Sequence, residues 1–255
     1  MAYSHFSYKS KVMGREISME VSLPCYESAY KGTAEKFKTV YFLHGFSGSA
    51  ENYMTRLMLR EVASANGLAV VAINGENMAY LDCEWTGAYF STWIGTELLD
   101  VTRKVFPLSE RREDTCIAGF SMGGYGSLVN GIRHADRFGK IGVMSGGALR
   151  FAEFGSSERL PEIMENIMGG KEKYKNSYAF LPNALQKACD ENRDLPMIHM
   201  VCGTSDFVYS DNAALDSFLK ERSVPHTFSE YPGEAHTVQF INKALPEIMH
   251  LLAQD

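Results

Sequence analysis

Short apolar runs alternate with helix-like segments along this chain, and this alternation leaves few folds open to it. Such runs predict buried strands of a parallel sheet, because helices cover both faces of a parallel sheet. The expected buried strands are 39–43, 68–73, 115–118, 141–145 and 197–202, with further strands at 17–23 and 226–231. The expected helices are 51–66, 92–106, 122–134, 215–222 and 237–253. The pattern predicts an α/β fold with a mostly parallel twisted sheet.

One domain over residues 1–255 is expected. A single α/β domain often reaches this length, and no linker, internal repeat or low-complexity segment divides the chain. The stretch 149–195 is polar and helix-prone and interrupts the alternation of strands and helices. Two interpretations of it stay open: a small helical cap that shapes a pocket over one end of the sheet, or an addition without function.

Charge and hydropathy narrow the classes of partner. The net charge is −6, and the 25 Lys and Arg residues are scattered, so there is no basic patch for nucleic acid or an anionic membrane. No apolar run approaches the ~20 residues of a membrane span, and residues 1–13 lack the apolar centre of a signal peptide. We therefore expect a cytoplasmic protein with a small-molecule substrate. Association into a homo-oligomer stays open.

The cysteines indicate a reducing compartment and no metal site. They are odd in number and widely spaced, without the close pairs of zinc or redox motifs. Cys116 and Cys202 lie inside apolar runs, where a free thiol behaves as a small hydrophobic group. The others are Cys25, Cys83 and Cys189.

The strongest chemical signal is the G-x-S-x-G pattern centred on Ser121, in Gly119-Phe120-Ser121-Met122-Gly123. This pattern marks a nucleophile elbow, in which a strand turns sharply into a helix and exposes the serine. Glycines on either side leave room for the turn, and the helix N-terminus favours developing negative charge. The pattern follows an apolar run and precedes a helix-like segment, as an elbow requires. The alternative is a tight turn with an idle serine.

A serine needs a base, and His236 is the best candidate. It lies in a loop between the last expected strand and the last helix, at the sheet end where α/β folds bind ligands. The other histidines after Ser121 are worse placed, inside a strand or helix or at an element's far end: His134, His199, His226 and His250.

The acid that orients the base should lie between Ser121 and His236, after a strand. Asp206 meets this requirement in Cys202-Gly203-Thr204-Ser205-Asp206. Asp211 is the rival, although we expect it to cap the following helix. Asp190 and Asp194 precede the strand and so lie at its wrong end.

Two backbone N–H groups should form an oxyanion hole. The first is expected from Met122, after the nucleophile, and the second from Phe46, in the glycine-containing loop after strand 39–43. His44 would then orient that loop. Trp85 and Trp93, within an aromatic cluster, are candidates for an acyl or sugar pocket or for core packing.

With these residues in place, the chain resembles the esterase D branch of the α/β-hydrolases, especially the small bacterial tributyrin-type esterases. The branch also includes S-formylglutathione hydrolases, feruloyl esterases and mycolyltransferases. The resemblance covers nearly the whole chain and rests on Leu23-Pro24, Leu43-His44-Gly45 with Gly48, the elbow extended through Gly126, Cys202-Gly203 with Asp206, and Pro232-Gly233 with His236.

The resemblance implies a twisted sheet of about nine strands, hydrolysis of short acyl esters, no cofactor, and the same triad and oxyanion residues. One departure concerns the region after the base. Members of the branch commonly have an acidic residue and tryptophans there, whereas this chain has Thr237, Val238 and Phe240. The packing behind the histidine is therefore expected to differ.

The leading hypothesis is a serine carboxylesterase that forms an acyl-enzyme on Ser121. Its substrates would be simple short-chain esters or acetylated or feruloylated plant-sugar esters. An acyltransferase using the same acyl-enzyme and a thioesterase similar to S-formylglutathione hydrolase are the alternatives. A binding protein without catalysis is a third hypothesis, and the intact serine, aspartate and histidine count against it.

Overall fold

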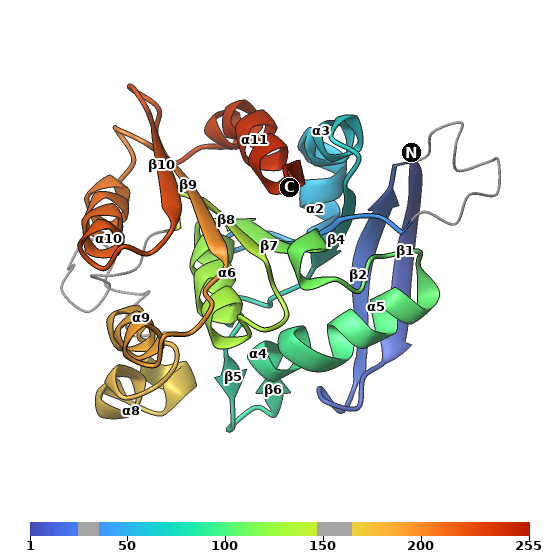
Figure 1. Cartoon of the computed structure of the whole chain (residues 1–255). Helices are drawn as coiled ribbons and strands as arrows, with labels where there is room; N and C mark the ends of the chain where they lie inside the picture. The colour runs from blue at the N-terminus through green and yellow to red at the C-terminus, as the bar shows by residue number, and fades with distance from the viewer. Residues whose placement is uncertain (25–35, 147–164) are drawn as a thin grey trace.

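The computed structural model describes residues 1–24, 36–146 and 165–255 and contains an eight-stranded sheet. Its strand order is β1-β2-β4-β3-β7-β8-β9-β10 (Figure 1). Strand β2 is antiparallel to both neighbours, and the strands from β4 to β10 are parallel. The predicted α/β fold class is therefore confirmed. The strands are β1 (Ala2–Lys9), β2 (Glu16–Leu23), β3 (Thr39–Leu43), β4 (Ala69–Ile73), β7 (Thr115–Phe120), β8 (Lys140–Met144), β9 (Met197–Gly203) and β10 (His226–Tyr231).

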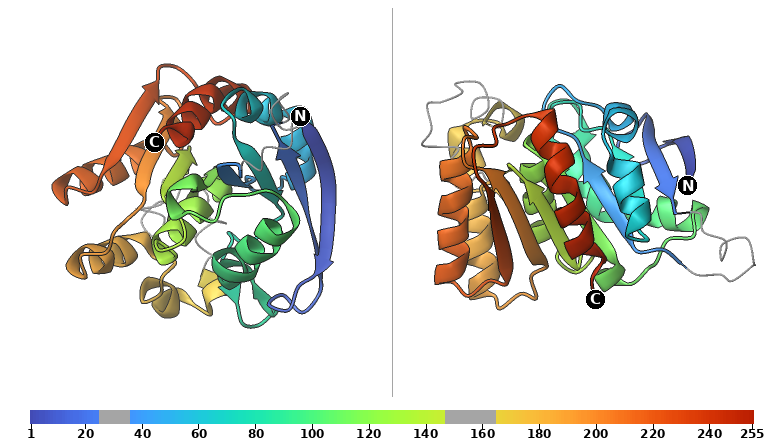
Figure 2. Two further views of the ribbon diagram at one scale, coloured as in Figure 1. Left: turned by 45° about the vertical axis from the view of Figure 1, so that its right-hand side comes forward. Right: turned by 90° about the horizontal axis from the view of Figure 1, so that it is seen from above.

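Helices cover both faces of this sheet (Figure 2). Successive residues of a strand point to opposite faces, so Val40 and Phe42 pack in one apolar cluster while Tyr41 and Leu43 pack in the other. The first cluster includes α2 (Ala50–Arg56), α3 (Leu59–Ala65) and α11 (Val238–Ala253). The second includes α4 (Phe90–Trp93), the π-helical turn Ile94–Leu98, α5 (Leu99–Val105), α6 (Met122–Arg133), α8 (Lys171–Lys175), α9 (Leu181–Asp190) and α10 (Tyr209–Glu221).

Three features differ from the expectations. Strand β1 escaped prediction because it lies at the sheet edge with its residues alternately exposed and half-buried, which leaves little apolar alternation. The expected helix 51–66 is two helices, because Leu57 is extended and the Met58 N–H donates to Asn242 of α11. The irregular segment before α4 contains a small hairpin, β5 (Asp82–Cys83) and β6 (Ala88–Tyr89).

The main sheet has eight strands in the described chain, where the resemblance implied about nine. The cap interpretation falls partly on 149–164, outside the described residues; α8 and α9 form in the rest of that stretch. The four described cysteines are free thiols, and Cys116 and Cys202 are buried as expected.

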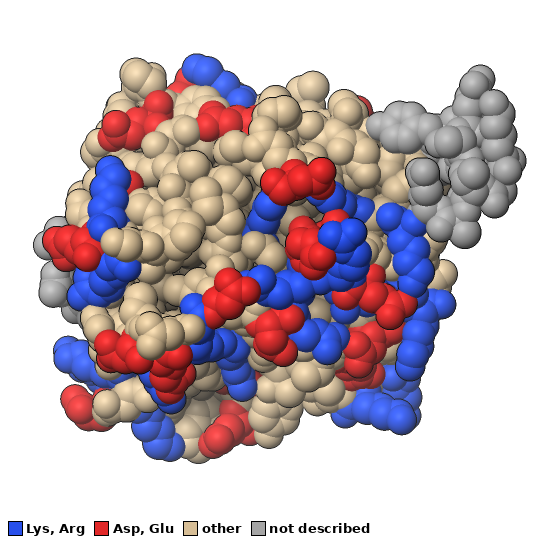
Figure 3. Space-filling view, viewed as in Figure 1, with Lys and Arg blue, Asp and Glu red and all other residues tan. Residues whose placement is uncertain are grey.

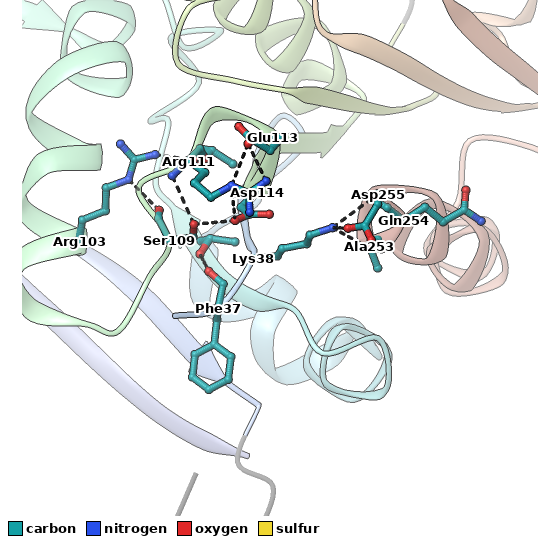
Figure 4. A network of polar contacts seen from close by, with 12 residues as sticks. Phe37, Lys38, Arg103, Ser109, Arg111, Glu113, Asp114, Ala253, Gln254 and Asp255 are labelled. Carbon is teal, nitrogen blue, oxygen red and sulfur yellow. Dashed lines mark hydrogen bonds and ion pairs between the residues drawn. The ribbon is translucent and has the colours of Figure 1, made fainter. Parts of the chain in front are cut away.

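Polar contacts fix the sheet at the amino ends of β3 and β7 (Figure 4). Lys38, directly before β3, donates to the Ala253 and Gln254 carbonyls and binds the Asp255 carboxylate at 2.6 Å. The Ser109 hydroxyl donates to Asp114, directly before β7, at 2.7 Å. The Lys38 contacts anchor the C-terminal end of the chain at the amino ends of the parallel strands.

The charged side chains are mixed on the surface, as their scattered positions in the sequence predict. On the face shown in Figure 3, Lys and Arg side chains are interspersed with Asp and Glu. Within the described ranges, no helix combines the length and the apolar character needed to cross a membrane.

Candidate active site

Ser121 occupies a strained turn between β7 and α6. Its backbone has φ 56° and ψ −119°, outside the regions that side chains ordinarily adopt. The turn requires glycine nearby: a Cβ on Gly123 would lie 2.0 Å from the Leu43 carbonyl oxygen, and one on Gly119 would lie 2.5 Å from the Gly123 backbone. This is the geometry of a nucleophile elbow, with the serine at the carboxyl end of a central strand.

The structure brings Ser121, His236 and Asp206 together in the order predicted. The His236 Nε2 lies 2.8 Å from the Ser121 Oγ, and Nδ1 lies 2.9 and 3.0 Å from the two Asp206 oxygens. A carboxylate only accepts hydrogen bonds, so Nδ1–H donates to Asp206 and Nε2 accepts from the serine hydroxyl. The Asp206 side chain is fully buried, and that of His236 is 18 % exposed.

Two further donors hold the Asp206 carboxylate. The Val208 N–H donates to Oδ1 at 3.0 Å, and the Ser145 hydroxyl donates to Oδ2 at 2.6 Å. Ser145 directly follows β8, is buried and has φ 49°. Sequence reasoning missed this residue, although its position at the carboxyl end of a parallel strand was a usable signal.

Backbone contacts join the loop that carries the acid to the loop that carries the base. The Thr204 N–H donates to the Tyr231 carbonyl, and the Ser205 N–H donates to the Glu234 carbonyl, both at 3.0 Å. A Cβ on Gly203 would lie 2.1 Å from that Glu234 oxygen, so only glycine allows the two loops to approach this closely. The separation of Asp206 and His236 is thus set by backbone packing.

The two expected oxyanion donors are available. Neither the Phe46 N–H nor the Met122 N–H donates to another described residue. Met122 begins α6, where the N–H groups lack partners within the helix.

His44 holds the loop that carries Phe46. Its Nδ1 donates to the Gly45 carbonyl at 2.7 Å, and its Nε2 accepts from the Gly75 N–H at 3.0 Å. Burial lowers the pKa of His44, so the ring stays neutral and keeps both hydrogen bonds. The structure therefore places His44 where the sequence analysis expected it, orienting the loop.

Two phenyl rings contact the imidazole of His236. The ring centroids of Phe120 and Phe207 each lie 4.5 Å from the centroid of the imidazole. Phe120 is 7 % exposed and Phe207 is 56 % exposed, so one ring packs on the buried side and the other stands in solvent. Sequence reasoning missed both; their positions next to Ser121 and Asp206 were the only signal.

The rival residues lie elsewhere. His134 follows the C-terminus of α6, His199 lies within β9, His226 contacts Asp216 at 3.1 Å, and His250 lies on α11. Asp211 was expected to cap α10, and this prediction is wrong. Val208 occupies the cap position, and Asp211 lies buried in the first turn.

The two tryptophans lie in different environments. Trp93 is 1 % exposed and its indole N–H donates to the Tyr8 hydroxyl at 2.8 Å, so it is part of the core. Trp85 shares a cavity with Arg133, the last residue of α6, whereas Ser121 precedes the first. The helix separates these ends by ~18 Å. Trp93 also lines a cavity with His44 and Gly48, on either side of Phe46 in its loop. A substrate-binding role for the two tryptophans therefore stays a prediction.

The arrangement suits acyl transfer. A serine hydroxyl bonded to an imidazole, which is itself bonded to a buried carboxylate, can attack a carbonyl and pass on its proton. Among the described residues, no group of three or more His, Cys, Asp or Glu side chains is placed to hold a metal ion.

Known proteins similar to this chain are esterases and serine hydrolases. The family model named Esterase matches residues 10–251. An acetyl esterase from Caldicellulosiruptor saccharolyticus is 31% identical over 257 residues, which cover 95% of each protein. The family model spans nearly all elements described above, including every residue of the Ser121, Asp206 and His236 cluster.

Solved structures agree with this match. The fluorophosphonate-binding serine hydrolase FphF of Staphylococcus aureus superposes with a TM-score of 0.89 at 29% identity, covering 100% of this chain and 99% of that one. The S-formylglutathione hydrolase FrmB of the same organism gives 0.85 at 28% identity, covering 99% of both chains. The fold is therefore that of the α/β-hydrolases.

Proposed function

This chain belongs to the Esterase family and is a serine carboxylesterase, and we propose that it hydrolyses short-chain acyl esters, acetyl esters above all, through an acyl-enzyme on Ser121. The observation that carries the proposal is the continuous chain of hydrogen bonds from Ser121 through His236 to the buried Asp206. The acetyl preference draws on the acetyl esterase that is similar over 95% of this chain.

In the proposed reaction, Ser121 Oγ attacks the ester carbonyl carbon while His236 Nε2 takes the hydroxyl proton. The Phe46 and Met122 N–H groups stabilise the resulting oxyanion. The carbon–oxygen bond to the alcohol then breaks, and Nε2 returns the proton to the leaving oxygen. Water attacks the acyl-enzyme by the same route and releases the acid and free Ser121. Asp206 stabilises the imidazolium throughout.

We further place the protein in the cytoplasm, with a small-molecule ester as its partner and neither nucleic acid nor a membrane. The scattered charges and the free thiols support this. No observation on the described residues favours an acyl acceptor other than water, so the transferase alternative is not preferred. The similarity to an acetyl esterase over 95% of this chain favours an ester over a thioester substrate.

A series of p-nitrophenyl esters tests the acyl preference. We expect kcat/KM to be highest for the acetate or butyrate and at least about tenfold lower for the octanoate. The esters differ only in the acyl chain, so differences in kcat/KM within the series come from contacts of that chain. The leaving group is constant, so its reactivity cannot create the trend. A maximum at the octanoate would contradict the short-chain proposal.

A further inference from the structure

The space beside His236 receives the alcohol part of the ester. In the proposed function, His236 Nε2 gives its proton to the leaving oxygen, so that oxygen comes within hydrogen-bonding distance of the imidazole. The carbon atoms attached to it must then lie within a few ångströms of the same ring. Side chains that stand exposed beside His236 therefore select the alcohol group.

One such side chain is large and apolar, and a second exposed apolar residue lies close to His236 in the sequence. The Phe207 ring lies 4.5 Å from the imidazole, between centroids, and is 56 % exposed. Val238, two residues after His236 and the first residue of α11, is 54 % exposed. Phe120 covers the imidazole as well but is buried. Exposed apolar area of this size is unfavourable in water, so its burial under an apolar group stabilises the complex.

Three polar side chains of the adjoining loops already make internal contacts. The Thr237 hydroxyl accepts from the Phe240 N–H at 3.2 Å, and the Glu234 carboxylate pairs with Lys243 at 2.6 Å. The Thr204 hydroxyl accepts from the Gly233 N–H at 2.9 Å. A sugar brings many hydroxyl groups that lose water on binding and need partners. Each of these three side chains already uses one of its hydrogen-bonding positions internally, so it has fewer left to offer to a sugar.

We propose that the alcohol group of the natural ester is apolar, aliphatic or aromatic, and that Phe207 and Val238 are its specificity-determining residues. The inference rests on the proposed function and chooses between simple esters and plant-sugar esters. It concerns only the alcohol group, next to His236, and makes no statement about the acyl group on the other side of the carbonyl carbon.

A matched pair of acetates tests this. Butyl acetate and 2-methoxyethyl acetate have alcohols of the same length, with one CH₂ exchanged for an ether oxygen. The ether oxygen makes 2-methoxyethanol the better leaving group in water, so intrinsic reactivity opposes the expected result. We expect wild-type kcat/KM for butyl acetate to exceed that for 2-methoxyethyl acetate about fourfold, the effect of one buried CH₂.

Variants assign the selectivity to residues. In Val238→Thr and Phe207→Ser the ratio of the two kcat/KM values should fall toward one, while the ratio for p-nitrophenyl acetate over butyrate stays unchanged. Val105→Thr is the matched control, because Val105 is 53 % exposed on α5 and belongs to no part of the site. It should keep the wild-type ratio. Both site variants alter exposed side chains, so folding should be preserved.

Three results would overturn the proposal: a wild-type ratio at or below one, a ratio that neither site variant lowers, or a higher kcat/KM for acetylated xylo-oligosaccharides than for butyl acetate. Failure of the proposed function looks different, because no acetate would then be hydrolysed and Ser121 would not react with a fluorophosphonate.

Discussion

Ser145 shows how a single hydroxyl supports the cluster around Ser121. Its hydroxyl donates a short hydrogen bond to Oδ2 of Asp206, and the Val208 N–H donates to Oδ1. The two donors together hold the carboxylate in the orientation that faces His236. Hydrogen bonds to a charged group contribute about 1.5–3 kcal/mol, more than bonds between neutral groups. The hydroxyl touches no substrate, so we regard Ser145 as a positioning residue.

Ser145→Ala should lower kcat/KM by about tenfold to a hundredfold. The Ser145 hydrogen bond holds the carboxylate that stabilises the imidazolium, so its loss should raise the free energy of the transition state by about 1.5–3 kcal/mol. The fall should lie in kcat and leave KM for p-nitrophenyl acetate within about twofold. Alanine and serine are equally strained at φ 49°, so the substitution changes only the hydroxyl.

Ser127→Ala is the matched control for this substitution. Ser127 is also buried, and its hydroxyl donates to the Gly123 carbonyl within α6 at 2.7 Å. We expect its kcat/KM to stay near the wild-type value. Equal losses in both variants would show that Ser145 acts only through general stability.

The chemistry of the individual residues was largely predictable. Ser121, Asp206 and His236 each follow an expected strand, and their order along the chain limited the choices. Ser145 and Phe207 were missed although each follows or lies near a strand end, because nothing in the sequence tells which strand ends come within contact distance of one another. The sequence could not decide the role of the tryptophans either, because an aromatic cluster in the sequence is equally consistent with a pocket and with a core.

Among the elements, the pair β9 and β10 couples the site to stability. Both strands end in loops of the site, and His199 within β9 contacts the Thr227 hydroxyl of β10 at 3.0 Å. Burial, with a smaller effect of Lys140, lowers the pKa of His199 to about 4. The ring is thus neutral in the folded chain at pH values where an unfolded chain already binds a proton.

The free energy of unfolding should therefore fall with acid. An unfolded histidine titrates near pH ~6.5, so between there and about pH 4 the unfolded state holds more protons than the folded state and is favoured as the pH falls. His199 alone should cost roughly 2 kcal/mol between pH 7 and pH 5. Above pH ~6.5 its contribution is constant.

Urea unfolding at pH 7 and pH 5 measures this, with His199→Gln expected to lose less stability on acidification than wild type. His250→Gln replaces an exposed histidine of α11 and serves as the control. If wild type and His199→Gln became less stable by the same amount, the role assigned to His199 would be wrong.

At the scale of the whole molecule, the fold was predictable where strands are buried on both faces. Strands β3, β4, β7, β8 and β9 are continuous apolar runs, and each was predicted within about two residues. Edge strand β1 and the split between α2 and α3 were not predicted, because both depend on contacts with distant parts of the chain. Asn242, for example, interrupts a helix that the local sequence favours.

The whole molecule also explains why the site is where it is. Strands β3, β7, β8, β9 and β10 run parallel, so the loops after them meet at one edge of the sheet, and each supplies a residue: Phe46, Ser121, Ser145, Asp206 and His236. At the opposite edge, the contacts of Lys38 join the start of β3 to the end of α11. The proposed chemistry is thus a consequence of strand direction.

The most direct test of the central claim is the intact mass of the protein after treatment with a fluorophosphonate, with p-nitrophenyl acetate turnover recorded in parallel, for wild type and Ser121→Ala. A single adduct on wild type is expected, absent from Ser121→Ala, with turnover reduced at least about a thousandfold in that variant. An adduct on folded Ser121→Ala, or turnover close to that of wild type, would contradict the assignment of Ser121 as the nucleophile.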